Sequence, residues 1–364
     1  MNLALKGIGL ATPGFRISQE DACELTYDMS CDSAEQRRKM SAIYRRSGVR
    51  ERGSVLLRTS DGSLDERETF YLPRIHPDDR GPGTAARMRL YQAESLPLAV
   101  QASCTALNAA GYSAGKVTHL ITVSCSGFSA PGIDVGLIQD LQLDRSTPRT
   151  HVGFMGCHAA FNALRIASAI AAADPAALVL VCAVELCSLH HFYGWDPEKI
   201  VANALFADGA GAAVCGDKGR NENSNLCVLR HGSTVIDGTL DAMSWNIGDN
   251  GFEITLSQEV PQLIEKHLRP WLDSFLRAEG LRVESVGSWA IHPGGPRILD
   301  ACRKALALTE DHLAISRQIL AAHGNMSSAT IFFLLDRLKQ LDATRPIVAL
   351  GFGPGLTIEA MILG

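Results

Sequence analysis

The chain has 364 residues, of which 46% are hydrophobic and 20% are charged, so it carries enough apolar surface for a large core. Its net charge of -5 and the lack of a dense basic cluster argue against nucleic acid as a partner. The ten cysteines form no C-x-x-C pair and no zinc-like spacing, so we expect no metal site and free thiols in a reducing compartment. No apolar run approaches the roughly 20 residues that span a bilayer, and the first ten residues lack signal-peptide character. We therefore expect a cytoplasmic protein without a membrane partner.

The first half alternates apolar strands with helical stretches, which is the pattern of an α/β fold. The predicted elements are a strand at 2–11, helical sequence at 18–47, a helix at 88–111, a strand at 118–125, a short helix at 133–141, a helix from 157 to about 173 and a strand at 177–184. The segment 50–86 is charged and interrupted by Pro and Gly, which indicates loops.

The second half repeats this organisation. It is predicted to contain a strand at 286–291, a helix from about 296, a helix at 329–339, a strand at 346–350, a loop at 351–355 and a strand at 356–363. The orders Gly156-Cys157-helix-strand and Gly324-Asn325-helix-strand correspond, which indicates an internal duplication. We predict halves at 1–220 and 221–364, divided within the loop-like stretch 217–225. Two corresponding helices packed back to back would bring Cys157 and Asn325 to one pocket.

Cys157 is the residue around which the predicted chemistry is organised. It follows Gly156 at the predicted start of a helix, in Gly-Phe-Met-Gly-Cys-His-Ala-Ala. Unpaired N–H groups and the helix dipole favour the thiolate at such a position, as a nucleophile requires. Buried cysteines are more often inert packing residues, so position alone leaves both interpretations open.

His292 and Asn325 are the candidate partners of Cys157. Each lies beside a glycine or a Pro-Gly turn at the end of a strand or the start of a helix, where active sites of open α/β sheets collect. The alternatives are a structural histidine and an ordinary helix cap, but the coincidence with the duplication favours one shared site. In such a trio the thiolate can accept an acyl group from coenzyme A. His292 and Asn325 can then polarise a second thioester and stabilise the enolate left when it loses CO2.

Papain-like proteases have the same order of Cys, His and Asn along the chain. Their cysteine lies near the mature N-terminus in a different motif, whereas Cys157 lies in the middle of this chain. We therefore favour carbon–carbon bond formation on thioesters over proteolysis.

Five segments carry a resemblance to a known family. They are Gly-Phe-Met-Gly-Cys157, Ala-Leu-Phe206-Ala-Asp-Gly-Ala, Ile-His292-Pro-Gly-Gly-Pro-Arg-Ile-Leu, Gly-Asn325-Met-Ser-Ser-Ala-Thr and Gly-Phe-Gly-Pro-Gly at 351–355. In this order they resemble the type III polyketide synthases, the chalcone and stilbene synthase family, and the segment 243–254 resembles its bacterial members. The resemblance implies an α/β thiolase fold, with two pseudo-duplicated halves in αβαβα layers, and a homodimer.

The resemblance also implies roles for individual residues. Cys157 would carry the acyl group, and His292 and Asn325 would drive the decarboxylation of malonyl-CoA. Lys39 and Arg46 match basic residues for the coenzyme A phosphates, although alanine stands where a third is expected. The implied substrate-binding residues are Phe206, Ile254, Cys187, His190, Ala130, Ser327, Gly351, Phe352, Gly353, Pro354 and Gly355. No cofactor is implied beyond the coenzyme A thioesters that serve as substrates.

Two substitutions bear on the starter. Ile254 stands where plant members have a second gatekeeper phenylalanine beside the one matched by Phe206, and Ala130 stands where a methionine reaches across the plant dimer. These small residues favour room for a long acyl chain, although Trp245 can equally close that room.

The predicted function is iterative, decarboxylative condensation of malonyl-CoA onto an acyl-CoA starter held on Cys157. Cyclisation would give a pyrone, resorcinol, phloroglucinol or chalcone-type product, with a fatty acyl starter slightly favoured. One alternative is an acyltransferase that loads Cys157 without condensation. Another is an idle acyl-binding subunit, against which the intact trio argues.

Overall fold

The computed structural model describes residues 3–218 and 226–364. The first half contains β1 (Leu3–Ala11), β2 (Arg16–Ser18), α1 (Gln19–Ser30), α2 (Ala34–Arg46), β3 (Glu51–Gly53), α3 (Leu64–Arg67), α4 (Thr84–Ala110), β4 (His119–Ser124), α5 (Ile133–Asp140), β5 (Arg149–Gly153), α6 (Ala159–Ala173), β6 (Leu178–Leu186), α7 (Pro197–Leu205) and β7 (Asp208–Asp217). The second contains β8 (Leu226–Val235), β9 (Met243–Gly248), β10 (Gly251–Leu256), α8 (Val260–Arg277), β11 (Ser288–Ile291), α9 (Pro296–Leu306), α10 (Glu310–His323), α11 (Thr330–Gln340), β12 (Ile347–Gly353) and β13 (Thr357–Leu363).

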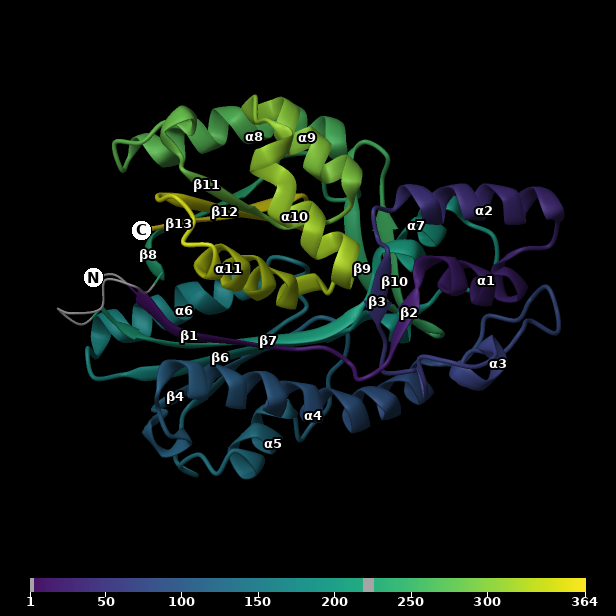
Figure 1. The fold of residues 1–364 in the computed structure, drawn as a ribbon, viewed down its shortest axis with the longest axis horizontal. Helices are drawn as coiled ribbons and strands as arrows, with labels where there is room; N and C mark the ends of the chain where they lie inside the picture. Colours follow the sequence, from purple (N-terminus) through teal and green to yellow (C-terminus); the bar gives the residue numbers. More distant parts are fainter. Residues whose placement is uncertain (1–2, 219–225) are drawn as a thin grey trace.

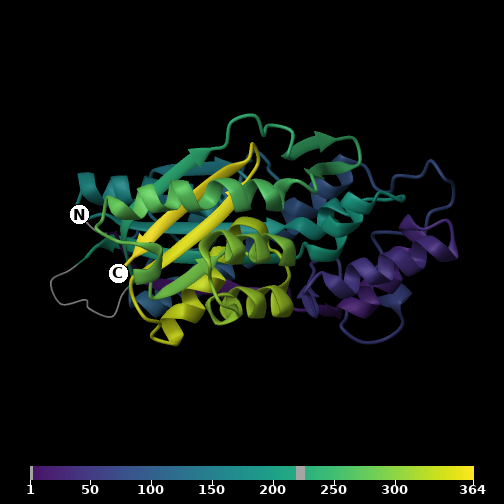
Figure 2. The same ribbon diagram turned by 90° about the horizontal axis from the view of Figure 1, so that it is seen from above.

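The five predicted layers are present (Figure 1). Helices α4 and α5 cover one outer face, α6 and α11 lie side by side in the middle, and α8 and α9 cover the other outer face. Strands of the first half fill the lower β layer in this view, and strands of the second half fill the upper one. Figure 2, from above, shows α8 lying over β12 and β13, with α1 and α2 beyond the end of the sheet.

The two β layers belong to one nine-stranded mixed sheet, ordered β11-β12-β13-β8-β1-β7-β6-β4-β5. The join is the antiparallel pairing of Leu3–Leu5 in β1 with Leu226–Val228 in β8. The two halves are therefore continuous through backbone hydrogen bonds. The predicted boundary between residues 220 and 221 lies outside the described residues.

Strand β6 shows why the core strands read as unbroken apolar sequence. Val179, Val181 and Ala183 pack against the middle helices, whereas Leu178 and Leu180 pack against the α4 side. Successive side chains of a strand point to opposite faces, so a strand covered by helices on both faces needs apolar residues at every position.

Several element boundaries differ from the sequence-based expectation. The helical stretch 18–47 divides into α1 and α2, because the Ser33 side chain accepts a hydrogen bond from Gln36 N and starts a new helix. Helix α6 begins at Ala159, not at Cys157. Strand β12 continues to Gly353, so most of the predicted 351–355 loop is strand.

Within the described ranges, 3–218 and 226–364, no helix is long and apolar enough to cross a membrane. The same residues contain no group of three or more His, Cys, Asp or Glu side chains arranged to hold a metal ion.

Candidate active site

Cys157 lies in the connection between β5 and α6, two residues before the first residue of α6. Gly156 has a φ of +81°, a left-handed conformation that favours glycine. A Cβ added to Gly156 would lie 2.4 Å from Cδ of Pro354. The Sγ of Cys125 accepts a hydrogen bond from Gly156 N at 3.1 Å. The backbone that presents Cys157 is therefore fixed from two sides.

His292 directly follows β11. Its backbone N–H donates to the Leu350 carbonyl at 2.8 Å, which ties it to β12. The residue is 1% exposed, and neither ring nitrogen has a hydrogen-bond partner among the described residues. Burial, with a smaller contribution from the nearby His158, lowers the pKa of His292 to about 3. The imidazole is therefore neutral and free to accept a proton or to donate one to a ligand.

Asn325 is placed by its backbone as well as by its side chain. Its N–H donates to the Leu205 carbonyl at 2.8 Å, and its carbonyl accepts from Ala207 N at 3.0 Å. Its side-chain Oδ1 accepts from Ser327 N at 2.9 Å. This hydrogen bond fixes the orientation of the amide, with Oδ1 toward Ser327 N and the NH2 group directed away from it.

The three predicted catalytic residues converge. Asn325 lies close enough to raise the pKa of His292 and to lower that of Cys157, although these contacts fall short of formed hydrogen bonds. Cys157 and Asn325 stand before α6 and α11, the two helices of the middle layer, as the predicted duplication requires.

The resting charge of Cys157 differs from the expectation. Burial, together with the nearby Glu185, raises the pKa of Cys157 to about 11, although contacts with Ser327 and Asn325 act to lower it. The direction of this shift opposes the expected resting thiolate. The cost of removing a charged thiolate from water is larger than the stabilisation that the start of a helix gives it, because desolvation penalises the charged form.

Cys157 opens into an inner cavity of about 40 Å³. It is lined by Cys125, Ser126, Gly156, Cys157, Glu185, Cys187, Phe206, Met243, Ser244, Trp245, Ile254, Ser327 and Pro354.

Glu185 is the carboxylate of this wall, and the sequence analysis did not select it. It accepts hydrogen bonds from Cys125 N at 2.9 Å, Ser126 N at 3.0 Å and the Ser126 hydroxyl at 2.7 Å, and also from the Ser328 hydroxyl. Burial raises its pKa. The sequence did contain a signal for it: Glu185 is an acidic residue near the end of an otherwise apolar strand. A carboxylate buried in that way requires hydrogen-bond donors around it.

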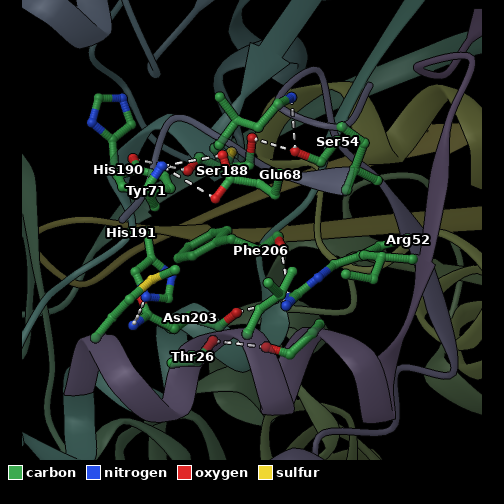
Figure 3. A pocket seen from close by; sticks show the side chains of 18 of the residues that line it. Thr26, Arg52, Ser54, Glu68, Tyr71, Ser188, His190, His191, Asn203 and Phe206 are labelled. Atoms are coloured by element: carbon green, nitrogen blue, oxygen red, sulfur yellow. Dashed lines mark hydrogen bonds between the residues drawn. The ribbon is translucent and has the colours of Figure 1, made fainter. Parts of the chain in front are cut away.

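An outer cavity of about 100 Å³ lies next to the inner one, between α1, the segment 52–71 and the turn after β6. Figure 3 shows polar side chains, among them Arg52, Glu68 and Asn203, arranged around Phe206. Four residues line both cavities, and we call them the collar: Cys187, Phe206, Trp245 and Ile254. The collar separates the nucleophile from the outer cavity.

The other residues predicted to bind substrate fall into two groups. Ser327 and Pro354 line the inner cavity, and His190 lines the outer one. His190 is held in place, because its Nε2 donates to the Ser126 carbonyl at 2.6 Å and its Nδ1 accepts from Phe252 N at 2.9 Å. Ala130 is exposed and lines neither cavity.

The remainder of the Gly-Phe-Gly-Pro-Gly segment acts in packing. Gly351 and Gly353 lie in β12 so close to α6 that a Cβ would meet Phe161 at 2.8 Å or His158 at 2.3 Å. Phe352 is buried in the core below α8 and α9, and Gly355 turns the chain with a φ of +113°.

The two residues predicted to bind coenzyme A are not brought together. Lys39 pairs with Glu35 at 2.7 Å on the exposed face of α2. Arg46 lines a third cavity of about 450 Å³ between α2, α7 and the first residues of α8 and α9. Arg297 lines it as well, and we call it the arginine-lined cavity.

Comparison with known proteins agrees with this geometry. Residues 2–219 match the N-terminal domain of chalcone and stilbene synthases, and residues 229–364 match the C-terminal domain. The chain is 32% identical to Pks18 of Mycobacterium tuberculosis, described as α-pyrone synthesis polyketide synthase-like, over 98% of this chain and 90% of that protein. It is 33% identical to the 3,5-dihydroxyphenylacetyl-CoA synthase of Amycolatopsis orientalis over 73% of this chain and 74% of that one.

Similar solved structures belong to the same class of enzyme. PKS-I from the brown alga Ectocarpus siliculosus superimposes with a TM-score of 0.89 at 29% identity, over 100% of this chain and 98% of that one. The C-terminal type III polyketide synthase domain of Steely1 from Dictyostelium gives 0.90 at 27% identity, over 100% and 99%. The thiolase fold, the two family domains and the mycobacterial relative agree, and the chain belongs to the chalcone and stilbene synthase family, as a type III polyketide synthase of bacterial type.

Proposed function

We propose that the protein condenses malonyl-CoA onto an acyl starter held on Cys157 and releases a cyclised product. The observation that carries the proposal is the position of Cys157 and Asn325 before α6 and α11 and of His292 after β11, with Asn325 near both other side chains and Cys157 lining the inner cavity.

The loading step uses the Cys157 thiol and the His292 imidazole, both neutral at the start. The Cys157 thiol gives its proton to His292 as the sulfur attacks the thioester carbonyl of the starter. The bond from that carbonyl to the coenzyme A sulfur breaks, and coenzyme A leaves as the thiol with the proton from His292. The ring nitrogens of His292, which have no hydrogen-bond partner among the described residues, support this role.

The extension step uses the two N–H donors. The bond between the malonyl methylene and its carboxylate breaks, CO2 leaves, and the electron pair forms an enolate at the thioester oxygen. The Asn325 NH2 and a His292 N–H stabilise that oxygen. The carbanion then attacks the acyl carbonyl on Cys157, and the sulfur leaves as a thiolate, so the lengthened chain is now a thioester of coenzyme A. For a further cycle the thiolate attacks that thioester carbonyl, and coenzyme A leaves and takes a proton from solvent. No base has to remove a proton from the malonyl group, because the loss of CO2 itself generates the carbanion.

The starter is proposed to be an aliphatic acyl group. The inner cavity holds only about three or four heavy atoms, at about 10–15 Å³ for each water-sized site. A longer chain must therefore cross the collar into the outer cavity, where Ala22, Leu25 and Met29 of α1 supply apolar wall. The name of Pks18 supports a pyrone as the first product to seek, with a resorcinol, phloroglucinol or chalcone-type ring as the alternatives.

The protein is also proposed to act as a cytoplasmic homodimer that needs no cofactor besides its coenzyme A thioesters. Strand β5 ends the nine-stranded sheet, pairs only with β4 among the described strands, and has four of its five residues exposed. An exposed edge strand is a template for pairing with a second copy. All ten cysteines are free thiols, which suits a reducing compartment.

The test is incubation with malonyl-CoA labelled in its free carboxylate and with starters from acetyl-CoA to long-chain acyl-CoA, using Cys157→Ala as the control. We expect labelled CO2 and a cyclised product that both depend on the thiol. Acyl loading on Cys157 without CO2 release would instead establish the acyltransferase.

A further inference from the structure

We propose that His158 is a positioning residue for the nucleophile Cys157. A directed chain of hydrogen bonds passes through the His158 ring and ends at the Pro354 carbonyl, and it holds the turn between β12 and β13 against the backbone that presents the thiol. The inference deepens the proposed function and rests on it, because it concerns how the same thiol is kept in its reactive position.

The residues of this chain share one face of α6 and one face of β13. His158 precedes α6 as its N-cap residue, and Asn162 and Arg165 follow it in the helix. Their spacing places all three side chains on one side of α6. Thr357 and Glu359 are alternate residues of β13, so their side chains point to the same side of the sheet. The two faces meet where Arg165 pairs with Glu359, which is 3% exposed.

The direction of each hydrogen bond is fixed by the arginine. A guanidinium group has no acceptor, so Nη1 of Arg165 donates to Oδ1 of Asn162 at 3.0 Å. The other end of that amide, Nδ2, is a donor and lies 3.1 Å from Nδ1 of His158. Nδ1 therefore carries no proton, and the ring proton is on Nε2, which lies 2.6 Å from Oγ1 of Thr357. Because Oγ1 accepts this bond, the Thr357 hydroxyl donates to the Pro354 carbonyl at 3.1 Å.

The end of the chain contacts the backbone of the nucleophile. Pro354 lines the inner cavity, and its Cδ lies 2.4 Å from the place that a Cβ on Gly156 would take. The His158 ring fills the space beside Gly353, because a Cβ added there would lie 2.4 Å from Nε2. The ring, the turn and the segment before Cys157 therefore pack without room for another methyl group. A movement of the turn would be transmitted to Gly156 and to the thiol that follows it.

The chain of hydrogen bonds also fixes the charge of His158 beside the second catalytic residue. His158 lies close enough to His292 to lower the pKa of that ring. A positive charge on His158 would oppose the proposed transfer of a proton from Cys157 to His292. Asn162 disfavours that charge, because its NH2 group occupies the nitrogen at which the His158 ring would be protonated. Burial acts in the same direction and lowers the pKa of His158 to about 4.

The experiment removes one hydroxyl from the chain and measures the reactivity of the thiol. Thr357→Val keeps the shape of the side chain without the hydroxyl, whereas Thr357→Ser keeps the hydroxyl. Alkylation by iodoacetamide is followed at Cys157 and at the exposed Cys104 by mass spectrometry, so each protein carries its own reference. We expect the rate at Cys157, relative to Cys104, to fall about tenfold in Thr357→Val and to stay within about twofold of wild type in Thr357→Ser. The reason is that rate falls steeply when reacting groups leave their productive geometry.

His158→Phe tests the ring itself, because it keeps an aromatic side chain without either nitrogen. We expect the same loss as in Thr357→Val, and the double variant should lose no more than either single variant, since both interrupt one chain. Thr234→Val is the matched control. It removes a hydroxyl from a half-buried threonine of β8, which pairs with β13, and this hydroxyl takes no part in the chain. Its rate at Cys157 should equal that of the wild type.

Equal rates in Thr357→Val and Thr357→Ser, or losses that multiply in the double variant, would overturn the assignment. A urea midpoint that falls in Thr357→Val but not in Thr234→Val, with faster alkylation of Cys104, would also count against it, because the fold itself would then be lost. In turnover, kcat for CO2 release should fall with the alkylation rate while KM for malonyl-CoA stays unchanged. Because alkylation needs no substrate, absence of CO2 release from the wild type would count against the proposed function alone.

Discussion

Phe206 and Asn325 face each other as an isolated parallel β-bridge between the two halves of the chain. The bridge is closed by Asn325 N with the Leu205 carbonyl at 2.8 Å and by Ala207 N with the Asn325 carbonyl at 3.0 Å. One of these residues belongs to the collar and the other to the catalytic trio. A movement of the collar backbone at Phe206 would therefore displace the amide that is proposed to hold the enolate.

Replacement of Asn325 by alanine should separate loading from extension. We expect CO2 release from malonyl-CoA to fall by about 10²–10³-fold, the usual effect of removing one oxyanion donor. Acylation of Cys157 by the starter should persist, because that step uses the thiol and His292. Intact-protein mass spectrometry and trapped CO2 measure the two steps. Asn325→Asp, with a similar shape but no NH2, should behave like alanine; equal loss of both steps would contradict the assigned role.

Trp245 should control the length of the starter. Its indole N–H donates to the Cys125 carbonyl at 2.7 Å, and its ring lies 6.3 Å from that of Phe206 and 5.3 Å from that of His190. Trp245→Ala would join the inner and outer cavities. We expect kcat/KM for long-chain starters, relative to acetyl-CoA, to rise at least fivefold.

Trp245→Phe is the control for this change, because it keeps a ring in the collar and loses only the hydrogen bond. Its selectivity should stay nearer to that of the wild type. A starter profile that is the same in all three proteins would show that the collar does not limit chain length.

Gly156→Ala should damage both stability and turnover. The left-handed φ and the contact with Pro354 leave no room for a methyl group, so the strain must move Cys157 or the β12–β13 turn. We expect a loss of about 2 kcal/mol in the free energy of unfolding, together with reduced acylation. Gly115→Ala is the matched control: nothing lies within 4 Å of its added Cβ, and its φ is not positive. Equal urea midpoints for the two variants would exclude the strain.

Stability should decline in mild acid because of buried histidines. Burial lowers the pKa of His190 to about 3 and that of His158 to about 4, whereas unfolded histidine titrates near 6.5. Below that pH the unfolded state binds more protons, so the free energy of unfolding is fully present above about pH 7.5 and falls as the pH drops toward 4. His190 alone should account for about 1.4 kcal/mol per pH unit below 6.5. Urea titrations between pH 5 and 8 measure this slope.

His190→Gln should reduce the slope of the free energy of unfolding against pH by about the amount that one histidine contributes, even though the substitution lowers stability overall. Parallel curves for the wild type and His190→Gln would mean that His190 is not protonated on unfolding in this range.

The sequence predicted best where local patterns carry the information. Apolar runs such as 177–184 identified the strands, and the Gly-Cys157 and Gly-Asn325 starts identified the paired helices. These features depend on the period of side-chain burial and on backbone requirements at glycine, both of which are visible in a single chain. The trio followed, because topology brings the ends of such elements together.

The rest depended on contacts between distant segments. That β1 pairs with β8 as well as β7 cannot be read from either strand alone, so the sheet was not predicted as continuous. Ala130 is close in sequence to cavity residues, but its own segment turns it outward to solvent. The pKa of Cys157 depends on its burial by the surrounding wall and on the nearby charge of Glu185, and no local motif reports either.

The place of β13 in the sheet has a consequence for biosynthesis. Residues 357–363 come after every other strand in sequence, yet β13 lies between β12 and β8 in the interior of the sheet. Until the ribosome has released this segment, β8 has no partner on that side, and β11 and β12 are not linked to the other strands. Until β13 is available, the edges of β8 and β12 that it covers in the native sheet stay unpaired in the nascent chain. This stage of synthesis is therefore the one most exposed to aggregation and most dependent on chaperones.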